Sequence, residues 1–313
     1  MKKLFSLFLF WIAFFALDFA HAANKFAFCT TACTWDTTNT PNIWFTATGG
    51  GGSPTTIPGS GDFAIFDGAT CAGGLTCTIT AGTDISGTTL LGFTAGACTA
   101  STTGCILDFS VNNPSFTLTN VSSFSGTGTR KFLFGTGTWT FTSTSQGTLY
   151  DLTTTTNLDA TSVLTNTIIY SGNSTVLRTF AGGGRTYGTF SILANTARHG
   201  IVISGANTFG TLSIANGTWV QIPAGATTTI SNAPTITGTS ALPVSFQSSN
   251  INVGVATISV SSGTVAFDYT AFFGITGTGG ATFTATNSYD LGRNTNIGFP
   301  AWSAGGGGRI IGG

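Results

Sequence analysis

Two almost identical heptapeptides, TYGTFSI at residues 186–192 and TFGTLSI at residues 208–214, begin 22 positions apart. A return of about 20–50 residues is typical of a solenoid, in which each repeat forms one coil. The same step places isoleucine at four successive positions, which are Ile192, Ile214, Ile236 and Ile258. We therefore expect these side chains to form one ladder in the core of a stacked fold.

Apolar and polar residues alternate within each repeat. Phe190 and Ile192 alternate with Thr189 and Ser191, and TGTWTFTSTS at 136–145 has the same pattern. This period of two predicts short strands with one buried face. The expected fold is all-β: a right-handed parallel β-helix, or β-solenoid, with coils of about 22 residues stacked ~4.8 Å apart.

The composition agrees with this fold and excludes some partners. Charged residues make up 6% of the 313 residues, and the formal net charge is zero. Attraction to nucleic acid or to an anionic membrane needs a basic patch, so we expect no nucleic-acid partner. A surface without net charge is weakly protected against self-association, which is therefore an expected property.

The N-terminus has the features of an export signal. Lys2 and Lys3 precede an apolar stretch, and AHA at 20–22 supplies the small residues before a cleavage position. The alternative is a membrane anchor, but the stretch is short for a span and Asp18 interrupts it. We expect an exported protein, located outside the cell or on its surface.

Six cysteines form three close pairs in the sequence. In an oxidising compartment, such a set predicts disulfides, and local closure costs the least loop entropy. The favoured pairs are Cys29–Cys33, Cys71–Cys77 and Cys98–Cys105. A zinc site is the alternative, although the chain lacks a C-x-x-C pair and His199 is far away in sequence.

These features divide the chain into four parts. The predicted boundaries are a signal peptide at 1–22, an N-terminal cap with the first strands and three disulfides at 23–110, a β-solenoid at 111–303, and a glycine-rich tail at 304–313. A strict 22-residue register does not fit residues 111–185.

Segments near both ends carry a family resemblance. The first part of the chain resembles the opening of a widespread group of bacterial and phage surface proteins, through TWDTTNTPNIWFTATGGGG followed by IPGSGDFAIFDG. Two later segments are similar to the later part of the same proteins, namely TFAGGGRTYGTFSI and TGGATFTATNSYDLGRNTNIGF. The resemblance implies an extracellular parallel β-helix in a surface protein or fibre, and it brings no catalytic residues. The group often ends in Asn-Asn-x-Gly-Trp, which RNTNIGF replaces here.

Candidate catalytic and metal-binding residues are sparse. Asp62 and Asp67 flank the segment FAIF, where they fit a calcium site or a carboxylate pair, or simply the turns at the two ends of a strand. Their odd separation places them on opposite faces, which favours turns. Scattered Asp residues and a lone histidine follow, namely Asp108, Asp151, Asp159 and His199 next to Arg198. We interpret His199 as a surface turn residue and expect no catalytic, cofactor-binding or metal-binding residues.

Aromatic side chains suggest a different kind of site. Exposed aromatics bind sugars by stacking, and arginine adds hydrogen bonds; the candidates are Arg185, Tyr187, Trp219, Tyr269 and Tyr289. Tyr187 aligns with Phe209 in the repeat, which indicates a packing position instead.

The expected function is that of a secreted or cell-surface structural or adhesive protein without catalytic activity. Its expected partners are glycans or a cell-surface receptor. Two alternatives stay open: a phage-type receptor-binding fibre and a β-helix polysaccharide hydrolase or lyase.

Ice binding needs threonine at the same place on many coils. A constant step of 22 from Thr189 reaches Thr211 and then Ala233, so the sequence predicts no ice binding.

Overall fold

The computed structural model describes residues 23–300, except for 72–75, 96–104, 121, 125, 127, 145–146, 155, 161–162, 174, 195, 197 and 251–253. The predicted signal peptide, the predicted tail and Cys98 lie outside the described residues. Within them the chain is all-β, with two short 3-10 turns, η1 (Thr48–Gly50) and η3 (Thr83–Ile85), and no α-helix. No helix in this part is long and apolar enough to span a membrane.

The strands form two long sheets and one shorter sheet, which are parallel except where β3 joins β1. The first sheet consists, in spatial order, of β3 (Trp44–Phe45), β1 (Asn24–Ala27), β4 (Phe63–Phe66), β7 (Gly92–Ala95), β10 (Ser122–Ser123), β13 (Gly147–Asp151), β16 (Leu177–Ala181), β18 (Gly200–Ser204), β20 (Trp219–Ile222), β23 (Val244–Ser248), β26 (Thr270–Phe273) and β29 (Tyr289–Asp290).

The second sheet is shorter and lies in the N-terminal half. It contains β2 (Ala32–Trp35), β5 (Cys77–Ala81), β8 (Cys105–Asp108), β11 (Arg130–Leu133) and β14 (Leu158–Ala160).

The third sheet runs from β6 to the C-terminal end. It contains β6 (Thr89–Leu90), β9 (Phe116–Leu118), β12 (Thr138–Phe141), β15 (Val163–Tyr170), β17 (Thr186–Ile192), β19 (Thr208–Ala215), β21 (Thr227–Ile230), β24 (Ala256–Val260) and β27 (Ile275–Thr278). A branch from the end of β19 continues through β22 (Thr235–Thr237), β25 (Thr264–Asp268) and β28 (Thr282–Thr286).

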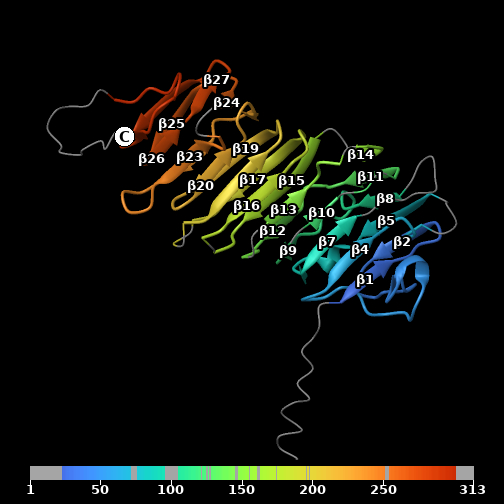
Figure 1. The fold of residues 1–313 in the computed structure, drawn as a ribbon. Helices are drawn as coiled ribbons and strands as arrows, with labels where there is room; N and C mark the ends of the chain where they lie inside the picture. Colours follow the sequence, from blue (N-terminus) through green and yellow to red (C-terminus); the bar gives the residue numbers. More distant parts are fainter. Residues whose placement is uncertain are drawn as a thin grey trace, which may run out of the picture.

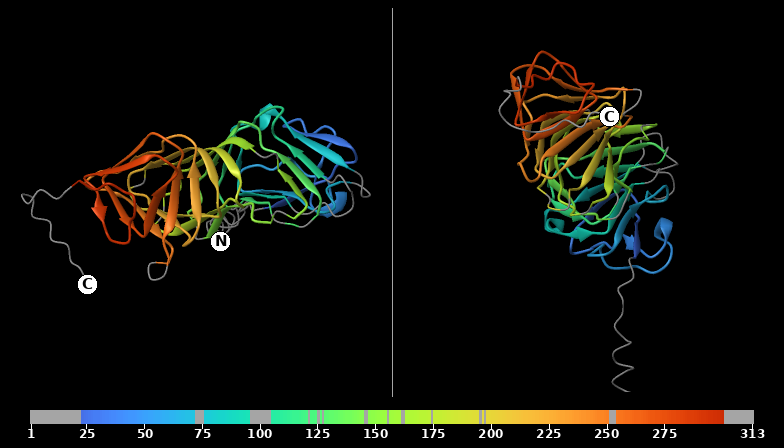
Figure 2. Two further views of the ribbon diagram at one scale, coloured as in Figure 1. Left: turned by 90° about the horizontal axis from the view of Figure 1, so that it is seen from above. Right: turned by 60° about the vertical axis from the view of Figure 1, so that its left-hand side comes forward.

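The chain visits the sheets in turn and advances along one axis. From β4 to β15 the strands belong to the first, second and third sheets in strict rotation. The colours in Figure 1 pass in order from β1 at one end to β27 at the other, and the left-hand view in Figure 2 shows the same elongated body. This arrangement of long parallel sheets is consistent with a β-solenoid.

Glycines let the long strands of the middle coils turn a corner. Tyr187 and Phe209 are buried, and Gly188 and Gly210 follow them. The next buried residue in each strand lies three positions after the aromatic residue and not two, so the alternation is interrupted at the glycine. A Cβ atom at Gly188 would lie 2.7 Å from the Thr165 carbonyl oxygen. The strands β17 and β19 therefore bend at these glycines, and each strand contributes to two sides of the coil.

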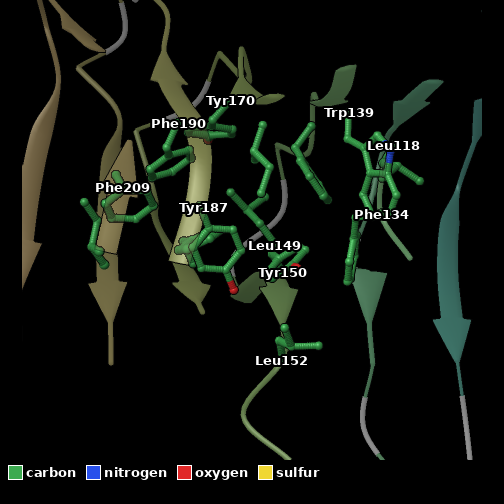
Figure 3. Close-up of a cluster of buried hydrophobic side chains, with 14 of the residues drawn as sticks. Leu118, Phe134, Trp139, Leu149, Tyr150, Leu152, Tyr170, Tyr187, Phe190 and Phe209 are labelled. Carbon is green, nitrogen blue, oxygen red and sulfur yellow. The ribbon is translucent and has the colours of Figure 1, made fainter. Parts of the chain in front are cut away.

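The core follows the predicted alternation. Trp139 and Phe141 are each 1% exposed, while Thr138 and Thr140 between them face outward. Aromatic rings pack against one another from coil to coil in the core. Figure 3 shows part of this cluster of buried hydrophobic side chains. The Tyr150 and Phe180 rings stack with centroids 4.9 Å apart, and Phe180 stacks on Phe190 at 4.6 Å.

The isoleucine ladder has three members and not four. Ile192 pairs with Ile214, and Ile214 pairs with Ile236. The next partner of Ile236 is Phe267, whereas Ile258 lies in β24 opposite Thr228. The inclusion of Ile258 was wrong because the coil after β22 is longer: 31 positions separate Ile236 from Phe267.

The step between paired residues varies along the whole chain. It is 29 between Phe63 and Gly92, and 19 between Gly200 and Trp219. Loops at the corners absorb these differences, since a loop can lengthen without changing the pairing of the strands beside it. A constant 22-residue coil therefore describes only the stretch that includes β17 and β19.

The ladder leads to a stability prediction. Ile214→Asp places an unpaired charge among buried apolar side chains, so we expect the free energy of unfolding to fall by about 4 kcal/mol or more. Ser213→Asp is the control, because Ser213 faces outward from the same strand, and its effect should stay within about 0.5 kcal/mol. Chemical denaturation followed by circular dichroism measures both. Equal stability of the two variants would contradict the assignment of the buried face.

Candidate functional site

The two carboxylates beside β4 serve the local backbone. Asp62 lies 2.9 Å from the ammonium group of Lys25 and accepts a hydrogen bond from the Gly59 amide. Asp67 accepts a hydrogen bond from the Ala69 amide. The two amide contacts are those expected of turn residues, whereas the ion pair joins two segments that are distant in the sequence.

The other predicted acidic residues are also engaged with close neighbours. Asp108 accepts hydrogen bonds from the amide and hydroxyl of Ser110, and Asp151 has the same contacts with Thr153. Asp159 forms an ion pair with Lys131, whose strand β11 is adjacent to β14. Asp151 belongs to the first sheet and the other two to the second, so the fold distributes these carboxylates over two sides of the coil.

The cysteines stack between neighbouring coils. Disulfides join Cys29 to Cys33 and Cys71 to Cys77, as predicted. Cys105 is disulfide-bonded as well, and its predicted partner Cys98 lies outside the described residues. The sulfur atoms of Cys71, Cys77 and Cys105 lie within 4.8 Å of one another. Disulfide sulfur is not the thiolate that binds zinc, so this cluster is a crosslink and not a metal centre.

A buried polar cluster lies where the chain turns from the third sheet into the first. We call it the polar corner; it consists of Ser143, Arg178, His199 and Thr218. The Nε atom of Arg178 donates to the Ser143 carbonyl at 3.3 Å, and Nε2 of His199 lies 3.4 Å from the Thr218 hydroxyl. The interpretation of His199 as a surface residue was wrong, since it is 0% exposed and the Tyr170 ring packs edge-on against it at 4.9 Å.

The environment of the polar corner keeps its histidine neutral. Burial, followed by the positive charge of Arg178, lowers the pKa of His199 to about 4. Burial also raises the pKa of Tyr170. Arg178 is 0% exposed, and its two terminal nitrogens have no hydrogen-bond partner among the described residues. Because the side chains of Arg178 and His199 are both enclosed, a polymer such as a glycan cannot contact them, and their effect is on stability.

The aromatic candidates separate into buried and exposed residues. Tyr187 is buried, and its hydroxyl donates to the Gly182 carbonyl at 2.6 Å, which agrees with its alignment to Phe209. Trp219 is partly exposed on the first sheet. Through Ser245 and Ala271, the same column of paired residues leads to Tyr289, which is 56% exposed. Of the candidates, the register thus aligns Trp219 with Tyr289.

Hydroxyl side chains form long columns that a constant step does not show. We call the outward side of β6, β9, β12, β15, β17, β19 and β22 the hydroxyl face. One of its columns has a hydroxyl at six of seven paired positions, which are Thr89, Thr117, Thr140, Ile169, Ser191, Ser213 and Thr235. Beside it stand Thr138, Thr167, Thr189 and Thr211.

The same register corrects the expectation about threonine. The prediction of a short ladder considered only the positions that follow Thr189, whereas Thr167 and Thr138 continue the ladder toward the N-terminus at steps of 22 and 29. The sequence signal for these columns is the alternation of Thr or Ser within each strand. It shows which residues face outward but not which of them become neighbours.

Known proteins provide no guide to the use of these surfaces. Comparison with family models, with curated proteins and with solved structures found no match to this chain.

The polar corner gives a pH prediction. The pKa of His199 is about 4 when folded, against about 6.5 when unfolded. The unfolded chain therefore binds more protons in this interval, and stability is lost as the pH falls from about 6.5 toward 4. We expect the wild type to lose roughly 3 kcal/mol of unfolding free energy between pH 7 and pH 4 relative to His199→Gln. Denaturant titrations at each pH test this, and parallel pH profiles of the two proteins would refute it.

Proposed function

We propose that this chain is an exported right-handed β-solenoid that acts as a structural or adhesive component outside the cell. The proposal rests on the stacking of hydrogen-bonded strands in three sheets, two of them long. This stacking makes an elongated body with extended side surfaces. Disulfides at Cys29–Cys33 and Cys71–Cys77 support an oxidising compartment. Right-handed crossovers are expected because about 98% of parallel connections have this hand.

The N-terminal end has the features of a disulfide-stapled cap. The antiparallel strand β3 covers the edge of β1, and the ring of Trp44, which is part of β3, packs edge to face against Trp35 with centroids 5.4 Å apart. A solenoid needs such a cover, because an open parallel edge is a template for pairing with another chain. Two of the disulfides lie within this end of the molecule. In our proposal the cap restricts self-association at this edge.

Adhesion to glycans would use the aromatic column of the first sheet. Trp219 and Tyr289 stand three strands apart, about 14 Å at the spacing of a parallel sheet. The residues between them, Ser245 and Ala271, are small. A sugar chain lying along the column can therefore reach both rings without crossing a bulky side chain.

The location is tested with the full chain, expressed in bacteria and followed by cell fractionation. We expect the protein outside the inner membrane, with Ala23 as its first residue and with no free thiol. Recovery from the cytoplasm with residues 1–22 intact and reduced cysteines would contradict export.

The binding surface is tested on a glycan array. We expect Trp219→Ala and Tyr289→Ala each to weaken binding by about tenfold or more, as aromatic anchors contribute about 1.4 kcal/mol or more. Leu291→Ala is the control, because this side chain is 57% exposed and lies outside the column. Binding that survives both aromatic substitutions would refute this surface.

A further inference from the structure

The hydroxyl face has a repeat in two directions. Along a strand, Thr138 and Thr140 are two positions apart, as are Thr189 and Ser191, which places their side chains about 6.6 Å from each other. Across the strands, paired positions repeat at about 4.8 Å. The strands β12, β15, β17 and β19 are consecutive in the sheet, and β15, β17 and β19 are seen next to one another in Figure 1. The two columns therefore form a grid four strands deep.

The groups on this grid are held in place and free to bind. Each of its strands is hydrogen-bonded to a strand on either side, which fixes the backbone. The β-branch of threonine restricts its χ1 angle, so little side-chain freedom is lost on binding. None of the hydroxyl groups at Thr138, Thr140, Thr189 and Thr211 forms a hydrogen bond with another part of the described chain.

The chemistry of the grid limits its partner. The two columns contain only Thr, Ser and one Ile, which is Ile169. They include neither a charge for an ionic partner nor an aromatic ring on which a sugar could stack. A lattice of methyl and hydroxyl groups instead matches a partner that is uncharged, forms hydrogen bonds in all directions and is itself periodic.

We propose that the hydroxyl face binds ice. Each contact with a water lattice is weak, because liquid water competes for the same hydroxyl group. Many contacts add only if their spacing is regular and their geometry is already fixed, which is the principle of preorganised binding. The loops at the corners differ in length, but the strands that they connect stay paired in the same register. The spacing of the hydroxyl groups is therefore regular in spite of the unequal loops. This function does not require attachment to a cell surface, so it can fail independently of the proposal above.

The test compares lysine substitutions on different sides of the purified full chain. We expect the wild type to produce thermal hysteresis and faceted ice crystals, and Thr189→Lys with Thr211→Lys to abolish most of the hysteresis. Gln221→Lys is the matched control, because Gln221 faces outward from the first sheet, and it should retain full activity. Thermal denaturation verifies that each variant is folded.

A second set of hydroxyl columns makes the assignment specific. Thr227, Thr257 and Thr276 are paired in β21, β24 and β27, on the side of the coil beyond the glycine bends. We expect Thr257→Lys to retain activity. Loss of hysteresis in this variant but not in the Thr189/Thr211 variant would overturn the assignment to the hydroxyl face. Hysteresis no greater than that of a non-binding protein at equal concentration would overturn the proposal. If such a result came with binding to crystalline chitin or cellulose, the hydroxyl face would be a polysaccharide-binding surface instead.

Discussion

The strands inside the three sheets depend on hydrogen bonds to the strands one coil before them and one coil after them. Ile214, for example, belongs to a strand that pairs with β17 on one side and with β21 and β22 on the other. Satisfying the backbone in this way is obligatory in a buried sheet. It fixes the register of every pair and therefore decides which side chains stack inside and which stand in columns outside.

Some polar side chains in the interior have hydrogen-bond partners that the corners of the coil enclose. Arg130 is 1% exposed, and its terminal nitrogens donate to four backbone carbonyls, of Gly128, Thr156, Phe124 and Thr154. At the polar corner, His199 stays neutral beside Arg178. A chain with 6% charged residues has few such groups to accommodate, and the buried His199 couples stability to pH.

The outer surfaces differ in chemistry although one backbone pattern makes them all. The first sheet presents Trp219 and Tyr289 in one column, and the third presents hydroxyl groups. The bends at Gly188 and Gly210 divide the third sheet into two sides, so the hydroxyl columns separate into two sets. Sugar binding and ice binding would thus use different sides of one rigid body, and variants on one side test that side alone.

The sequence by itself determined many of the strands and inward side chains and the disulfides Cys29–Cys33 and Cys71–Cys77, because alternation with a period of two and short cysteine spacing act over a few residues. It also predicted the pairing of Ile192, Ile214 and Ile236, whose coils are equal in length. Only the tertiary structure decided that Phe267 and not Ile258 follows Ile236, that His199 is buried, and that Thr138 and Thr167 extend the column of Thr189. The reason is physical: register is set by hydrogen bonds between strands, and the loops between them vary in length without changing it.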